Sequence, residues 1–181
     1  MTHPIKKFIS LVALLALAAG GDAPEESPGF RDTSKPLSVT TRANNPALHG
    51  QWFVREQFPG TNQFQEVFFA TRSVNLSSDI IETRERVCRT KFDCSGRETS
   101  WTAERLGINR WRLINDDESR SLQLWMIWID QGFRTAAVGT PDGSYGWIID
   151  RSQKGGADRI NAAREVLQFN GYQTRQLVEN E

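Results

Sequence analysis

The feature that most constrains this chain is a series of strand-like runs joined by short connections. Eight runs rich in β-branched and aromatic residues follow one another, each bounded by turn residues. Such a series is typical of an up-and-down antiparallel meander. Closing the meander into a barrel removes its free edges, and an eight-stranded barrel has room for one small ligand. The predicted strands span 50–58, 65–72, 79–88, 96–105, 109–114, 122–130, 132–139 and 144–151.

The sequence period changes after the last of these runs. Gly155-Gly156 ends the strand pattern, and Asp158 suits a helix N-cap. Asn170-Gly171 is a helix stop signal. We therefore predict an all-β fold, an eight-stranded up-and-down antiparallel β-barrel with one C-terminal α-helix packed on the outside. The apolar face of this helix recurs at helical spacing and consists of Ile160, Ala163, Val166 and Leu167.

The first residues are typical of a targeting segment. Lys6 and Lys7 precede the apolar run 8–19, which ends in small residues, so residues 1–20 are predicted to form a secretory signal peptide. Gly20 stands where a bacterial lipoprotein would carry its lipidated cysteine. We therefore expect a soluble exported form, periplasmic or secreted, in preference to a membrane anchor. Residues 21–45 are rich in Pro, Ser and Thr, which predicts a flexible segment before a barrel domain at 46–181.

Composition excludes several classes of function. Lys plus Arg (22) balances Asp plus Glu (22), and no basic patch suggests a nucleic-acid partner. The mean hydropathy of −0.51 argues against a multispanning membrane protein. After the leader, His49 is the only histidine, so neither a four-ligand zinc site nor a Ser-His-Asp triad is expected. We expect no metal and no cofactor.

The two cysteines lie close together in the sequence. Five residues separate Cys88 from Cys94, enough for a hairpin turn that places them on neighbouring strands. Because export permits oxidation, we predict a disulfide between them. Free thiols or a metal site are the alternatives.

Three segments resemble the lipocalin family, and within it the bacterial lipocalin and apolipoprotein D branch. Gly50-Gln51-Trp52-Phe53 is similar to the family's Gly-x-Trp-Tyr opening. The run 147–151 is similar to the branch's Trp-Ile-Leu-Ser-Arg strand, and the helix that follows continues the likeness. The family's middle signature, Thr-Asp-Tyr, is absent, and 129–133 occupies its place. Between residues 67 and 122 the likeness rests on strand count alone.

The resemblance implies a structural role for two residues. Arg151 should lie across the face of Trp52 at the closed end of the barrel, where a guanidinium over an indole contributes about 0.5–2 kcal/mol. A catalytic or substrate-binding arginine is the alternative.

The resemblance and the alternation of strand side chains together predict a ligand site inside the barrel. In 122–130 both faces are apolar, so alignment to the family decides for Trp125 and Ile127 as the inner residues. Core filling is the alternative, since side chains fill small barrels. The residues predicted to bind ligand are Val54, Glu56, Trp111, Trp125, Ile127, Val138, Tyr145, Trp147 and Ile149.

These features predict an exported carrier, not an enzyme. The resemblance implies a small hydrophobic ligand, a fatty acid, lysophospholipid or isoprenoid-like lipid, and peripheral association with the outer membrane stays open. One alternative is an enzyme acting on a bound lipid, with Glu56, Tyr145 and a cysteine as inward candidates for catalysis. The other is a protein-interaction module that uses the barrel mouth or the N-terminal segment.

Overall fold

The computed structural model describes residues 29–42, 45–59, 64–71, 78–90 and 93–180, and the predicted signal peptide lies outside them. Among the described residues, no helix is long and apolar enough to cross a bilayer. In chain order the elements are α1 (Asn45–Leu48), β1 (Gly50–Gln57), β2 (Phe64–Thr71), β3 (Ser78–Thr90), β4 (Asp93–Gly107), β5 (Arg110–Asn115), β6 (Ser121–Ile129), β7 (Thr135–Gly139), β8 (Gly146–Asp150), α2 (Ala157–Phe169), the 3₁₀ turn η1 (Thr174–Gln176) and β9 (Val178–Glu179).

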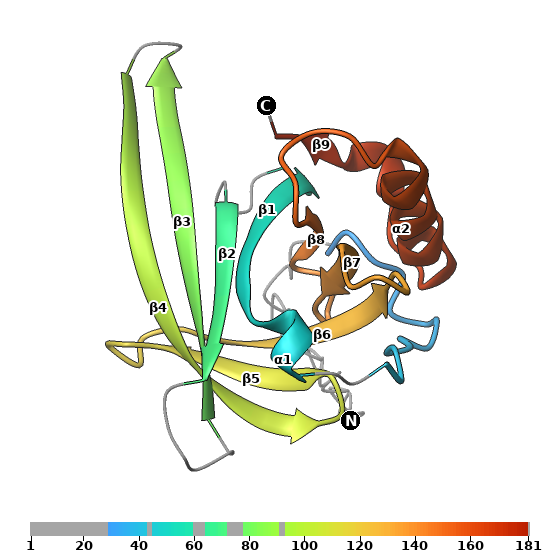
Figure 1. Cartoon of the computed structure of the whole chain (residues 1–181), viewed down its shortest axis with the longest axis horizontal. Helices are drawn as coiled ribbons and strands as arrows, with labels where there is room; N and C mark the ends of the chain where they lie inside the picture. Colours follow the sequence, from blue (N-terminus) through green and yellow to red (C-terminus); the bar gives the residue numbers. More distant parts are fainter. Residues whose placement is uncertain (1–28, 43–44, 60–63, 72–77, 91–92, 181) are drawn as a thin grey trace, which may run out of the picture.

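Strands β1 to β8 form a closed antiparallel barrel (Figure 1). Each strand pairs with its neighbour in sequence, and β1 completes the ring by pairing with both β2 and β8. The first half of β1 pairs with β2 and its second half with β8, while β9 pairs with β1 at Glu56 and Gln57. The predicted fold class, an eight-stranded up-and-down barrel, is confirmed.

The hairpin of β3 and β4 is much longer than the others. Its strands have 13 and 15 residues and extend well beyond the barrel (Figure 1). Cys88 and Cys94 are register partners across this hairpin, as a disulfide between neighbouring strands requires. The disulfide itself stays a prediction.

The barrel interior is filled by one apolar cluster, called here the inner core. Trp52, Trp101, Trp111 and Trp147 are all buried in it. Because side chains alternate along each strand, the cluster is built from residues on the inward face of the wall. Its other buried members are Leu48, Val54, Val67, Ile81, Ala103, Leu113, Leu124, Met126, Ile129, Ala136, Val138 and Ile149.

A second apolar cluster lies outside the wall, under α2. Ile160, Ala163 and Leu167 of the helix pack against Ile127, Ala137 and Ile148 of the wall, together with Phe58 and Tyr172. This confirms the predicted position of the helix. The N-cap is Gly156, at φ 73°, so Asp158 lies instead in the first turn, where its charge favours the helix N-terminus.

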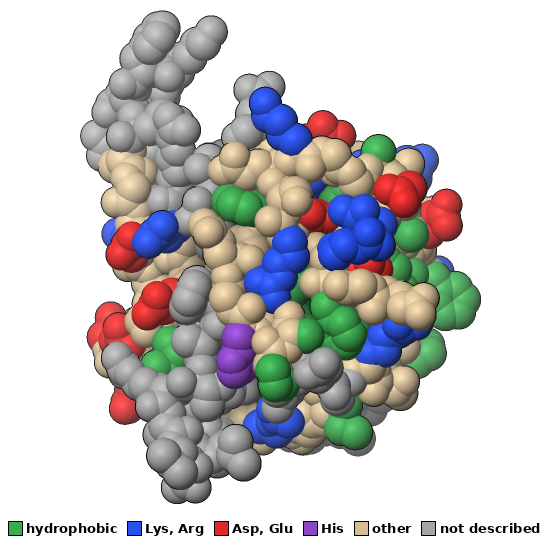
Figure 2. Space-filling model, viewed as in Figure 1, with side chains coloured by type: hydrophobic (Ala, Val, Ile, Leu, Met, Phe, Trp, Pro, Cys, Tyr) green, Lys and Arg blue, Asp and Glu red, His purple; other side chains and the backbone are tan. Residues whose placement is uncertain are grey.

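Two ion pairs join α2 to the barrel. Arg164 pairs with Glu56 of β1, and Arg159 contacts Asp150 of β8 at 3.2 Å. Both carboxylates are buried. Figure 2 shows basic and acidic side chains gathered side by side over the region where the helix meets these strands.

Residues 29–42, called here the strap, run along the outside of the barrel. The backbone N–H of Phe30 donates to the Gly143 carbonyl at 2.8 Å, and that of Thr40 donates to the Met126 carbonyl at 3.0 Å. Between them, Ser38 is bound to the Asn170 side chain. The flexible segment at 21–45 stays a prediction, while this part of it has defined hydrogen-bond partners on the folded domain. Its backbone polar groups find partners on the folded domain although its composition is polar.

Candidate functional site

The closed end of the barrel is built around Trp52 and Arg151. The Arg151 guanidinium lies 3.9 Å from the centroid of the Trp52 ring, and the indole N–H donates to the Leu48 carbonyl at 2.9 Å. Arg151 also donates to three backbone carbonyls, at 2.7 Å to Gln51, 2.6 Å to Ala47 and 2.8 Å to His49. Partial burial lowers the pKa of Arg151 from its ordinary value. Arg151 therefore lies across the face of Trp52 as predicted, and the role of the pair as a structural seal stays a prediction.

Six of the nine residues predicted to line a ligand site face the barrel interior. Five of them, Val54, Trp111, Val138, Trp147 and Ile149, are buried members of the inner core. The sixth, Tyr145, is only partly buried and packs against the edge of this cluster.

Glu56 does not face the interior. A β-bulge between Val54 and Glu56 adds one residue to β1 opposite β8, and this reverses the alternation from that point on. Glu56 therefore points outward under α2, where it is 2% exposed and accepts hydrogen bonds from both Nε and Nη2 of Arg164.

Trp125 and Ile127 also lie outside the barrel, so their predicted inward orientation is wrong. The inner residues of β6 are Leu124, Met126 and Ile129, and a bulge between Met126 and Trp128 interrupts the alternation. Ile127 packs under α2, while Trp125 is half-buried beneath the Arg110 guanidinium, 5.3 Å from the ring centroid. Both faces of β6 carry apolar residues because α2 covers part of its outer face.

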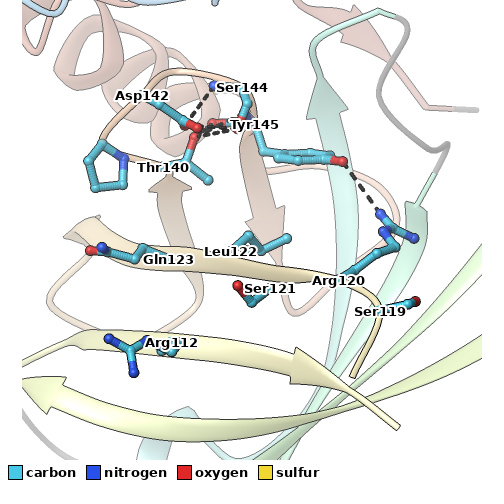
Figure 3. A pocket seen from close by; sticks show the side chains of 11 residues that line it. Arg112, Ser119, Arg120, Ser121, Leu122, Gln123, Thr140, Asp142, Ser144 and Tyr145 are labelled. Carbon is cyan, nitrogen blue, oxygen red and sulfur yellow. Dashed lines mark hydrogen bonds between the residues drawn. The ribbon is translucent and has the colours of Figure 1, made fainter. Parts of the chain in front are cut away.

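A cavity of about 540 Å³ opens at the other end of the barrel (Figure 3). The pairing of β6 with β7 begins at Trp125, so the first half of β6 is separated from the turn that joins β7 to β8. The cavity occupies this gap in the wall. It is lined by Arg112, Ser119, Arg120, Ser121, Leu122, Gln123, Thr140, Pro141, Asp142, Ser144 and Tyr145. Sequence reasoning identified only Tyr145 among them.

Arg120 extends across this opening. Its guanidinium donates to the Tyr145 hydroxyl at 3.5 Å, and Figure 3 shows the two side chains pointing toward each other. The same guanidinium lies 5.2 Å from the centroid of Trp101, a buried residue of β4. Arg112, on the same cavity, is paired with Glu104 at 3.4 Å. Within the described ranges, no carboxylate is close enough to form an ion pair with Arg120.

The acid of the cavity is held as a carboxylate by hydrogen bonds within its own turn. Asp142 accepts hydrogen bonds from the Ser144 backbone and hydroxyl, at 3.0 and 2.8 Å. Burial would raise the pKa of Asp142, but hydrogen bonds from Thr140 and Ser144 outweigh it and lower this pKa. The turn is also held from behind, since the Tyr172 hydroxyl donates to the Thr140 carbonyl at 2.8 Å. The cavity therefore combines Arg120, which has no ion pair among the described residues, the hydrogen-bonded Asp142 carboxylate, several hydroxyls and an apolar floor.

A second cavity, of about 510 Å³, lies at the base of the long hairpin. Its charged lining includes Glu82 and the pair of Arg84 with Glu98, which are 2.8 Å apart and largely exposed. These charges form a solvated face. Among the described residues, no group of three His, Cys, Asp or Glu side chains is placed to hold a metal ion.

Comparisons with known proteins show the fold. No family model matches the sequence, and no curated protein matches it either. Apocrustacyanin C1 is a similar solved structure, with a TM-score of 0.62 and 12% identity, covering 84% of this chain and 88% of that one. Lobster apocrustacyanin A1 is also similar, with a TM-score of 0.61 and 9% identity, covering 86% of this chain and 92% of that one. H1 crustacyanin from the lobster Homarus americanus has a TM-score of 0.59 and 12% identity, covering 86% of this chain and 92% of that one. Crustacyanins are lipocalins, so the chain has the lipocalin fold.

Proposed function

We propose that this protein is an exported carrier that holds one small hydrophobic molecule at the open end of its barrel. The observation that carries the proposal is the cavity in the gap between β6 and the β7–β8 turn. Its volume, about 540 Å³, lies within the range of about 300–1,000 Å³ that is usual for small-molecule sites. Leu122 and Tyr145 line the cavity and also pack against the inner core, so its floor is continuous with apolar surface.

The charge at the cavity favours a ligand with an anionic head group. Arg120 is half-buried, and a partly desolvated charge is stabilised when an opposite charge reaches it. The carboxylate of a fatty acid or the phosphate of a lysophospholipid supplies that charge, whereas a neutral isoprenoid-like lipid does not. Hydroxyls of Ser119, Ser144 and Tyr145 provide further hydrogen-bonding groups nearby.

The remainder of the ligand would contact apolar surface. When the head group binds Arg120, the tail would lie on Leu122 and Tyr145 and against the Trp101 ring, which Arg120 now covers. Transfer of this tail from water contributes about 25 cal/mol per Å² of apolar surface buried. No covalent chemistry is involved. The lipocalin fold supports a binding role of this kind, and the bacterial lipocalin and apolipoprotein D branch is the relationship we propose.

Catalysis on a bound lipid receives less support. Glu56, one of the candidates for catalysis, lies outside the barrel and is paired with Arg164. The N-terminal arm is also less suited to act as a free interaction module, because the strap is bound to the barrel.

Isothermal titration calorimetry with dodecanoate and dodecanol tests the proposal, because the two ligands share a tail and differ in head-group charge. We expect saturable binding of dodecanoate, and a Kd about tenfold higher in Arg120→Gln, as the loss of one charge-assisted hydrogen bond implies. Arg112→Gln is the matched control, since Arg112 lines the same cavity but already has Glu104 as partner.

The outcomes separate the two parts of the proposal. Equal affinity of both ligands, unchanged in Arg120→Gln, would remove the head-group assignment and leave hydrophobic binding. The absence of saturable binding by dodecanoate, dodecanol and a lysophospholipid alike would refute the carrier function.

A further inference from the structure

The β4–β5 turn carries basic side chains. Residues 105–110, which span this turn, contain Arg105 and Arg110 and no acid. The turn lies at the closed end, because β4 runs from the open end to the end where β8 also finishes. It is therefore at the opposite end of the barrel from the cavity described above.

Two aliphatic side chains are exposed on this turn. Leu106 is 39% exposed and Ile108 is 58% exposed. A register shift between Arg105 and Gly107 and the turn that follows interrupt the alternation, so neither side chain joins the inner core. The apolar surface of the turn therefore faces solvent.

A cation without a counter-charge lies beside these residues. The Arg110 guanidinium is positioned between the Trp125 ring, at 5.3 Å, and Gly107, where an added Cβ would be only 2.6 Å from Nη2. The Arg110 Nε is buried without a hydrogen-bond partner. No ion pair connects Arg110 to a carboxylate of the described residues. Its charge is held in place but is not compensated.

The strap brings another arginine to the same place. Asn109, in the left-handed conformation at φ 54°, donates from its side-chain amide to the Thr40 carbonyl at 2.6 Å and to the Arg42 carbonyl at 3.0 Å. Arg42 is exposed. The turn and this end of the strap therefore form one surface, called here the basic tip and consisting of Arg42 and residues 105–110.

We propose that the basic tip docks onto an anionic phospholipid surface. Leu106 and Ile108 enter the boundary between head groups and acyl chains, where aliphatic side chains leave water. The arginines Arg42 and Arg110 bind lipid phosphates, and each such cation strengthens attraction to an anionic leaflet. Trp125 lies at the level where tryptophan is favoured in membranes. In this orientation the cavity mouth faces away from the membrane, so the proposal does not depend on the proposed ligand.

Vesicle binding with a local readout tests the proposal. The full chain is mixed with vesicles of phosphatidylcholine alone or with an increasing fraction of phosphatidylglycerol, and bound protein is measured by co-sedimentation. Hydrogen–deuterium exchange of peptides covering 105–110 reports whether the tip itself is engaged, whatever the apolar run 8–19 contributes to binding. Leu106→Ser with Ile108→Ser is the test variant. Phe169→Ser is the control, since Phe169 is 83% exposed on α2.

We expect slower exchange in 105–110 as the anionic fraction rises, with no change around Phe169. The double variant should lose this protection and partition at least about tenfold more weakly, as expected for two partly buried aliphatic side chains. Phe169→Ser should behave as the unmodified chain. Unchanged exchange in 105–110 of vesicle-bound protein would overturn the proposal. Equal binding to both vesicle types, or equal effects of the two variants, would also overturn it.

Discussion

Replacing Arg151 is expected to destabilise the barrel without altering its ligand preference. Arg151→Met removes three hydrogen bonds to backbone carbonyls and the contact with Trp52. Each hydrogen bond from a charged donor contributes about 1.5–3 kcal/mol when well buried, and less at this half-exposed site. The cation–π contact adds about 1 kcal/mol. We therefore expect the free energy of unfolding to fall by about 3–4 kcal/mol, because the carbonyls of 47, 49 and 51 also lose their partner.

Urea unfolding followed by far-UV circular dichroism measures this change. Arg151→Lys is the informative comparison, because an ammonium keeps the charge but cannot reproduce the planar fork that reaches three carbonyls. It should recover about half of the loss. A loss below about 1 kcal/mol in Arg151→Met would refute the role of the seal. A variant of unchanged stability with altered dodecanoate affinity would instead favour a ligand-binding arginine.

Two further predictions concern buried carboxylates. Glu56→Gln should lower the free energy of unfolding by about 2 kcal/mol, because it leaves the partly buried Arg164 without its counter-charge. Urea unfolding, compared with the variant Glu104→Gln, measures this change. Glu104 pairs with Arg112 in a half-exposed position, so its variant should cost less than about 1 kcal/mol, and equal losses would contradict the reasoning. Burial would raise the pKa of Asp130, but hydrogen bonds from Thr135, Arg134 and Gly132 outweigh it, so the folded pKa lies below 3.8. The stability that Asp130 contributes is therefore complete above that pH and is lost as the pH falls below it. In Asp130→Asn, the free energy of unfolding, measured as a function of pH, should decrease less steeply in this acid range.

The period of the sequence was sufficient to predict the strands, the helix and the closure of the barrel. Hydrophobic alternation indicates which residues share a face of a strand. Eight strands joined by short connections can form only a few sheet topologies. Whether an individual side chain points into or out of the barrel was harder to predict, because one inserted residue reverses the alternation along a strand. The bulges beside Glu56 and in β6 place Glu56, Trp125 and Ile127 outside, and no residue type in those strands marks the insertion.

The sequence contained weaker evidence for the strap and for the cavity. The strap contributes only Phe30 and Leu37 to the outer cluster and is otherwise held by backbone hydrogen bonds and by side-chain hydrogen bonds such as those of Arg31, which sequence patterns do not reveal. Arg120 precedes β6 in a polar connection, and its position over Trp101 depends on how that connection folds back. Composition could not distinguish it from the other arginines of the chain.

Three arginines lie over tryptophans in the described part of this barrel, and their remaining contacts distinguish their roles. Arg151 has its N–H groups bound to carbonyls of its own chain, so the Trp52 pair is complete without an outside partner. Arg120 has the Tyr145 hydroxyl at 3.5 Å as its hydrogen-bond acceptor, and Arg110 has a buried Nε without one. An indole face attracts a guanidinium but accepts none of its in-plane hydrogen bonds. Arg120 and Arg110, one at the mouth and one at the opposite end, lack both such a set of carbonyl acceptors and an ion pair among the described residues, which is why we propose an external ligand for each of them and none for Arg151.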